Sequence, residues 1–170
     1  MMKISKSLCI ALLVCCAGCG TAPVADTKAK DEADIRALED RFAAAFKAKD
    51  VNAIMALYTP GQDLIVFDVT PPRQYTGWPA YKKDFEDFFA AFPGPADFTI
   101  TDLDVTVGGD VAFSHSIQHP IMTDKSGKKA EYAVRVTDGY KKINGQWLIS
   151  HEHVSIPVDM TTMKPDLDLK

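Results

Sequence analysis

The sequence predicts an α+β fold, with helices from the N-terminal half packed on a curved, mostly antiparallel sheet from the C-terminal half. Between residues 34 and 92, apolar residues recur at steps of three and four, which is the pattern of amphipathic helices. From residue 97 onward, strand-like segments are separated by short turns that contain glycine. Helices followed by a run of antiparallel strands is the element order of an α+β domain.

The composition indicates a single globular domain with a hydrophobic core. The chain has 170 residues, of which 46% are hydrophobic and 25% are charged. The formal net charge of −4 argues against nucleic-acid binding, because proteins that bind nucleic acids present a basic face.

Residues 1–19 have the pattern of a signal peptide. Lys3 and Lys6 form a basic start, and the apolar run that follows is too short to cross a bilayer of about 30 Å. The run ends in CAGC (16–19), which resembles a bacterial lipobox except that Cys16 stands where leucine is usual.

This resemblance implies that Cys19 is lipidated and anchors an exported protein to the membrane of the bacterial periplasm. Ordinary cleavage near Ala22 or Ala25 is the alternative and would leave the protein unanchored. All four cysteines lie in the leader, so we expect no disulfide within the domain. Residues 20–33 are small, polar and charged, which predicts a flexible linker.

The first two helices are predicted from stripes of apolar residues. A stripe that begins at Ile35 and ends at Phe46 predicts a helix from Asp34. Asp50 is placed to cap a short second helix, which Pro60-Gly61 stops.

A strand, a loop and a third helix follow. DLIVFDV (63–69) is a nearly continuous apolar run and predicts a strand, and TPPRQYTG (70–77) predicts an irregular loop. The third helix has a wide aromatic face that we assign to the core: Tyr81, Phe85, Phe88, Phe89 and Phe92. Long strands are then predicted over residues 97–107, 110–122, 130–143 and 146–158, and the tail (160–170) has no clear periodicity.

This order of elements resembles the nuclear transport factor 2-like cone, shared by ketosteroid isomerase and SnoaL-type polyketide cyclases. The stretches that resemble the SnoaL-like, ketosteroid isomerase homolog branch are VFDVTPPRQYTGWPAYKKDFEDFFAAFPGP (66–95), GGDVAFSHS (108–116) and RVTDGYKKINGQWLISHEHVSIPVD (135–159). The resemblance implies a SnoaL-like domain over residues 34–159, a conical pocket between sheet and helices, and a homodimer formed through the sheet. It does not imply one reaction, because the fold hosts enzymes as well as binding proteins.

Strand parity divides the polar cluster SHEHVS near the C-terminus. His151 and His153 point the same way, about 7 Å apart along the strand, together with Trp147 and Ile149. Glu152 points the opposite way, so the three residues do not form one contiguous triad. On the earlier strand, His115 shares a face with Phe113, and we expect this face to be the inner one.

Two registers are open for the last hairpin. A two-residue Asn144-Gly145 turn would place Asp138 opposite His151, so that a carboxylate orients an imidazole. A three-residue loop with a left-handed glycine would place Arg135 opposite His153, a pair that suits an anionic or carbonyl-bearing ligand. We favour the second register.

The sequence therefore predicts an exported SnoaL-like protein with a pocket for a small hydrophobic or carbonyl-bearing ligand, without a cofactor. The alternative is a cofactor-free isomerase, dehydratase or cyclase, with His153 or His151 as general acid/base and Arg135 polarising an oxyanion. A metal site built on the histidines ranks below both, and we assign no metal ligands. The residues expected to bind the ligand are Asp68, Trp78, His115 and Tyr58.

Overall fold

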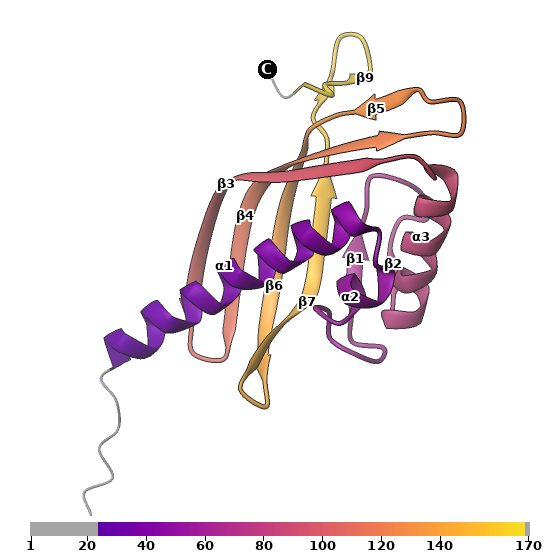
Figure 1. Cartoon of the computed structure of the whole chain (residues 1–170). Coiled ribbons are helices and arrows are strands. Elements are labelled where there is room, and N and C mark those ends of the chain that lie inside the picture. The colour runs from indigo at the N-terminus through magenta and orange to yellow at the C-terminus, as the bar shows by residue number, and fades with distance from the viewer. Residues whose placement is uncertain (1–23, 169–170) are drawn as a thin grey trace, which may run out of the picture.

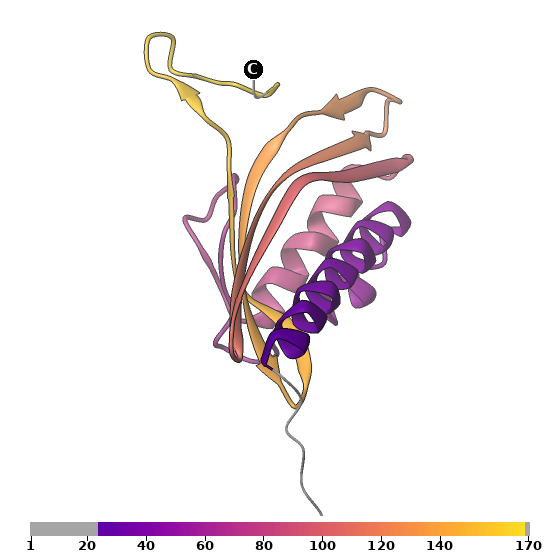
Figure 2. The ribbon, with the colours of Figure 1, turned by 90° about the vertical axis from the view of Figure 1, so that its left-hand side faces the viewer.

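The structure is a computed structural model that describes residues 24–168. In this part of the chain, helices α1 (Val24–Ala48), α2 (Val51–Met55) and α3 (Trp78–Ala91) lie on the concave side of a curved sheet (Figures 1 and 2). The strands are β1 (Ile65–Phe67), β2 (Tyr75–Thr76), β3 (Ala96–Gly108), β4 (Val111–Thr123), β5 (Lys129–Glu131), β6 (Val134–Ile143), β7 (Gln146–Ser155), β8 (Val158–Asp159) and β9 (Lys164–Pro165).

The main sheet has the strand order β2-β1-β7-β6-β4-β3, with β5 added to the end of β4. All neighbours are antiparallel except β1 and β7, which run parallel. The expected strand 130–143 is two strands, β5 and β6, which both pair with β4. β8 and β9 form a separate hairpin in the tail. No helix within residues 24–168 is long and apolar enough to cross a membrane.

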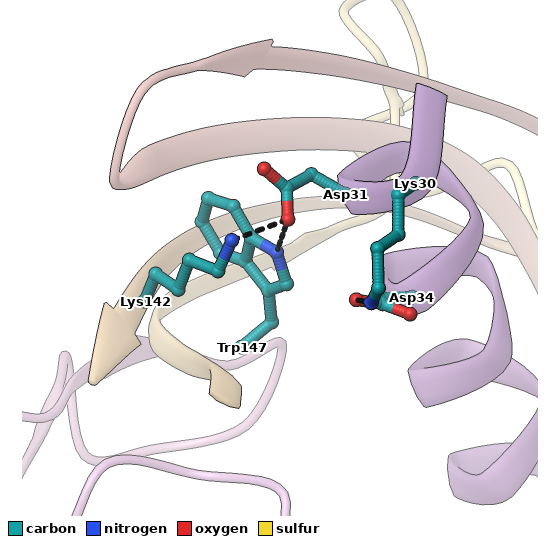
Figure 3. A network of polar contacts seen from close by, with 5 residues as sticks. All are labelled: Lys30, Asp31, Asp34, Lys142 and Trp147. Atoms are coloured by element: carbon teal, nitrogen blue, oxygen red, sulfur yellow. Dashed lines mark hydrogen bonds and ion pairs between the residues drawn. The ribbon is translucent and has the colours of Figure 1, made fainter. Parts of the chain in front are cut away.

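Helix α1 begins at Val24 rather than at Asp34, so residues 24–33 are not the flexible linker that we expected. This segment contains three alanines and two lysines, which favour helices. Asp31 fixes it to the β6–β7 hairpin, because its carboxylate accepts hydrogen bonds from Lys142 Nζ (2.6 Å) and Trp147 Nε1 (3.0 Å) (Figure 3). The expected signal peptide, Cys19 and residues 20–23 lie outside the described residues.

The core fills the space between the helices and the concave face of the sheet. The third-helix prediction is confirmed, since Tyr81, Phe85 and Phe89 on α3 are buried. Phe42 and Phe46 on α1 meet Phe98 on β3, with ring centroids 5.5 Å and 4.4 Å apart. The expected cap also forms, because the Asp50 carboxylate accepts a hydrogen bond from the Ala53 amide at 2.9 Å.

The β6–β7 hairpin follows neither expected register throughout. Asn144 and Gly145 form a two-residue turn, and both have positive φ (51° and 81°), as a type I′ turn requires. The favoured three-residue loop is therefore wrong. The ladder then shifts between Gly139 and Tyr140, where Gly139 pairs with His151 and Tyr140 with Ile149. Ser150 is the extra residue of a β-bulge, and its hydroxyl donates to the Gly139 carbonyl oxygen at 3.1 Å.

The bulge reverses which residues of β7 face the helices. Before it, Trp147 and Ile149 point inward and are buried. After it, the inward residue is Glu152, which is 5% exposed and pairs with the buried Asp138. Because side chains alternate along a strand, one extra residue moves every following side chain to the other face.

Candidate functional site

A cavity of about 120 Å³ lies between the concave face of the sheet and helices α1 and α3. The carboxyl and amide groups of its wall come from four elements or their ends: Asp68 after β1, Asp84 on α3, Gln118 on β4 and Glu152 on β7. Most of the remaining wall is aromatic and includes Phe42, Phe46, Tyr81, Phe85, Phe88 and Phe98.

A larger open groove of about 780 Å³ runs along the other side of α1, beside α2 and the start of β7. Alanines such as Ala37, Ala44 and Ala48 form much of its wall. Its charged residues, Asp34 and Arg41 among them, are exposed or half-buried. The smaller cavity is the better candidate site, because buried titratable groups line it.

Glu152 is the central acid of this cavity. Its carboxyl oxygens accept hydrogen bonds from two buried tyrosines, Oε2 from Tyr58 at 2.5 Å and Oε1 from Tyr81 at 2.5 Å. Burial raises the pKa of Glu152 to about 7, since the charged form loses its hydration, and the tyrosine hydrogen bonds oppose this shift only in part. A carboxyl group with such a pKa exchanges protons readily at neutral pH.

Asp68 lies on the same cavity wall, as the sequence led us to expect. Burial raises its pKa, and the nearby Asp84 carboxylate adds to that shift. The backbone N–H of Val69 donates to Asp68 Oδ1 at 2.5 Å and works in the opposite direction. Asp84 is held in turn by the hydroxyl of Tyr75, which donates to its Oδ1 at 2.6 Å.

Two further carboxyl groups lie in the core near Glu152. Asp138 is 1% exposed, and its Oδ1 has no hydrogen-bond partner among residues 24–168. Burial, together with repulsion from Glu39 and Glu152, raises the pKa of Asp138 well above its ordinary value. Glu39 on α1 accepts a hydrogen bond from the Tyr140 hydroxyl at 2.7 Å, and burial raises its pKa to about 7. Glu39 and Asp138 therefore keep their protons to a higher pH than exposed carboxyl groups do.

The histidines expected on the pocket wall lie on the outer face of the sheet, away from the cavity. His151 Nδ1–H donates to the Ile65 carbonyl oxygen at 2.8 Å, and the ring of Phe67 packs edge-on against His151 and His153. His153 pairs with Thr137 and is exposed. The placement of His151 and His153 on the wall was wrong because the bulge at Ser150 reverses the facing of β7.

Arg135 and His115 are also displaced from the expected pocket. Arg135 is exposed and pairs with Ser155 rather than with His153. His115 is exposed and lies 3.6 Å from the Asp104 carboxylate. Its strand face, shared with the exposed Phe113, is the outer one. A homodimer through the sheet would use this outer face, and that expectation stays a prediction.

The last two expected ligand-binding residues have structural contacts instead. Trp78 begins α3, and its indole N–H donates to the Met55 carbonyl oxygen at 2.8 Å. Tyr58 is 2% exposed and reaches the site only through its hydrogen bond to Glu152. Among residues 24–168, no three His, Cys, Asp or Glu side chains converge to hold a metal ion.

The residues that sequence reasoning missed are Glu152, Tyr81 as its donor, Asp84, Gln118 and Asp138. One signal for Glu152 was available in the sequence. Gly139 stands inside a strand pattern, and an isolated glycine there often marks a bulge. A bulge opposite Gly139 would have placed Trp147 and Glu152 on the same side of the sheet.

Comparisons with known proteins agree with this architecture. The SnoaL-like domain family matches residues 35–159. A nuclear transport factor 2-like protein of unknown function from Pseudomonas putida is 34% identical, with a TM-score of 0.74, over 84% of this chain and 97% of that one. A search of curated proteins found no match.

Two further solved structures have the same fold. A candidate calcium/calmodulin-dependent protein kinase II association domain from Xanthomonas campestris is 26% identical, with a TM-score of 0.64, over 79% of this chain and 91% of that one. A candidate scytalone dehydratase from Novosphingobium aromaticivorans is 19% identical, with a TM-score of 0.69, over 77% of this chain and 87% of that one. The chain belongs to the SnoaL-like domain family, with a nuclear transport factor 2-like fold.

Proposed function

We propose that the protein binds a small hydrophobic or carbonyl-bearing molecule in the cavity, and that Glu152 transfers a proton to or from it without a cofactor. The observation that supports this most is the position of Glu152. It is a buried carboxyl group on a largely aromatic cavity wall, with two tyrosine hydroxyls holding its oxygens. A rigid acid with a pKa near neutrality in an apolar site is suited to general acid–base catalysis.

The simplest reaction of this kind is proton removal from a carbon next to a carbonyl group. The Glu152 carboxylate takes the proton, the C–H electron pair forms a carbon–carbon double bond, and the carbonyl oxygen becomes an enolate oxygen. Gln118 and Tyr132 line the cavity and can donate hydrogen bonds to that oxygen. Return of the proton to another carbon completes an isomerisation, and loss of a β-hydroxyl as water completes a dehydration. The dehydratase name of one structural neighbour is compatible with this chemistry.

Binding without chemistry is the second candidate. The two tyrosine hydrogen bonds to Glu152 favour it, because a carboxyl group with a partner on each oxygen is also a stable structural element.

Hydrogen–deuterium exchange separates the two candidates. Small ketones and aldehydes, neutral and charged, are incubated with the protein in D₂O, and loss of the α-proton signal is followed by NMR. We expect exchange with the wild type and a loss of roughly 10²–10⁴-fold in Glu152→Gln. Glu86→Gln is the matched control, since Glu86 lies on the exposed face of α3 and pairs with Lys82. Equal exchange in wild type and Glu152→Gln would contradict proton transfer by Glu152.

Export and lipid anchoring remain part of the proposal. The basic start, short apolar run and CAGC ending of residues 1–19 support them. Mass spectrometry of the mature N-terminus from bacterial membranes should find a diacylglyceryl group on Cys19. A first residue at Pro23 or Asp26, without lipid, would contradict the anchor.

A further inference from the structure

The charged residues on the cavity wall are all acidic. Asp68, Asp84 and Glu152 contribute carboxyl groups, and no lysine, arginine or histidine of the described chain lines the cavity. A negatively charged ligand would therefore meet repulsion without a compensating cation. The uncharged wall is mainly aromatic, and the faces of aromatic rings carry negative electrostatic potential.

Gln118 gives an independent sign that a polar ligand group belongs in this cavity. Its side chain lies on the inner face of β4, is only 7% exposed and lines the cavity. It makes no side-chain hydrogen bond within residues 24–168. Gln118 is not among the residues of the described chain whose unpartnered polar atoms are fully enclosed, so its amide stays accessible from the cavity. It is therefore free to hydrogen-bond a polar group of a ligand there.

We infer that the cavity binds a small organic cation, an ammonium group with short apolar substituents and one hydrogen-bonding group. Aromatic faces and carboxylates attract such a cation together, and Gln118 meets its polar group. The volume of about 120 Å³ equals the volume of about four water molecules in the liquid, at about 30 Å³ each, so only a compact ligand fits. This inference names the ligand class of the proposed site and so rests on the proposed function.

A matched pair of probes tests the charge alone. Choline is compared with the neutral alcohol in which a tert-butyl group replaces its trimethylammonium group, because the two molecules have nearly the same shape. Binding to the purified protein is measured by calorimetry at about pH 8, above the pKa of about 7 of Glu152. We expect choline to bind roughly tenfold more tightly than the alcohol. Equal or weaker binding of choline would overturn the inference.

Variants of the cavity wall locate the site. Asp68→Asn should weaken choline binding roughly fivefold and leave the neutral alcohol unaffected. Gln118→Leu should weaken both probes, because both carry the hydroxyl. Asp87→Asn is the control, since it removes one negative charge from the exposed face of α3, where Asp87 pairs with Lys83. An equal loss of choline affinity in Asp68→Asn and Asp87→Asn would place the binding elsewhere and overturn the inference.

The two proposals fail separately. Proton exchange that depends on Glu152, without a preference for choline, would leave the function standing and refute the ligand class. Choline binding that depends on Asp68, without proton exchange, would confirm a cation site and refute the catalytic role of Glu152.

Discussion

The wild type should become less stable as pH rises from about 5 to 8, and Glu152→Gln should lose much less stability over the same range. The pKa of Glu152 is about 7 in the folded protein, against an ordinary value of 4.5. The folded state therefore keeps its proton over a range where the unfolded state has lost it. The contribution of Glu152 to the free energy of unfolding is fully present below its ordinary pKa of 4.5. This contribution is lost as pH rises through about 7, because folding then buries a charged carboxylate. The shift corresponds to about 3 kcal/mol.

The measurement is the free energy of unfolding in urea at several pH values. Glutamine cannot ionise, so the difference in stability between Glu152→Gln and wild type should move in favour of the variant by about 3 kcal/mol between pH 5 and 8. The absolute stability of the variant is not the readout, since its amide nitrogen cannot accept the second tyrosine hydrogen bond. Parallel curves for the two proteins would show that Glu152 does not titrate in this range.

Other titratable groups face Glu152 and keep their own pH dependence in this variant. They come from α1, the segments that follow α2 and β1, α3 and β6: Glu39, Tyr58, Asp68, Tyr81 and Asp138. Glu39 is expected to titrate in the same range, because burial raises its pKa to about 7 as well. The variant curve should therefore keep a residual slope, whereas Glu86→Gln should follow the wild type.

Local patterns were enough to predict most of the elements. The Asp50 cap depends on one side chain and an amide three residues later, so it can be seen in a short segment. The aromatic face of α3 depends on helical spacing alone. The family resemblance then joined these elements into the correct fold, and the family match over residues 35–159 supports it.

The site was harder to predict because it depends on one residue of register. Sequence parity separates Glu152 from His151 and His153 correctly, since the strand is regular over these three residues and their side chains alternate. Sequence parity also assigns His151 and His153 to the same face of the sheet as Ile149. This assignment is wrong because the bulge at Ser150 lies between them. The apolar residues before the bulge therefore indicated the wrong inner face for the residues after it.

The tyrosine partners of Glu152 are set by packing rather than by local pattern. Tyr58 follows α2 and Tyr81 lies on α3, 94 and 71 residues before Glu152 in the chain. Each tyrosine has an apolar ring that belongs in the core, so its hydroxyl partner cannot be read from spacing. The start of α1 could not be predicted from local pattern either. The polar segment around Asp31 has the composition of a linker, and its contacts with the β6–β7 hairpin are known only from the structure.

Asp31→Ala should destabilise the protein by about 1–3 kcal/mol, the cost of leaving buried hydrogen-bonding groups without a partner. Asp31 is 6% exposed, and its loss removes the acceptor of both Lys142 Nζ and the indole N–H of Trp147 (Figure 3). Burial alone would raise the pKa of Asp31, but the hydrogen bonds and charge of Lys142, with the hydrogen bond of Trp147, lower it overall. Its contribution to stability is therefore present at neutral pH and is lost as pH falls through the lowered pKa.

Asp34→Ala gives the matched comparison for this prediction. Asp34 lies one turn further along α1, and its ion pair within the described part of the chain is with the exposed Lys30 (Figure 3). Exposed ion pairs contribute little, so urea unfolding of Asp34→Ala should stay close to that of wild type. Hydrogen exchange should show faster opening of the first turns of α1 in Asp31→Ala alone. Because α1 also carries Phe42 and Phe46 into the cavity wall, binding of the cationic probe should weaken in the same variant. Equal stability of the two variants would mean that the β6–β7 hairpin does not hold α1 through Asp31.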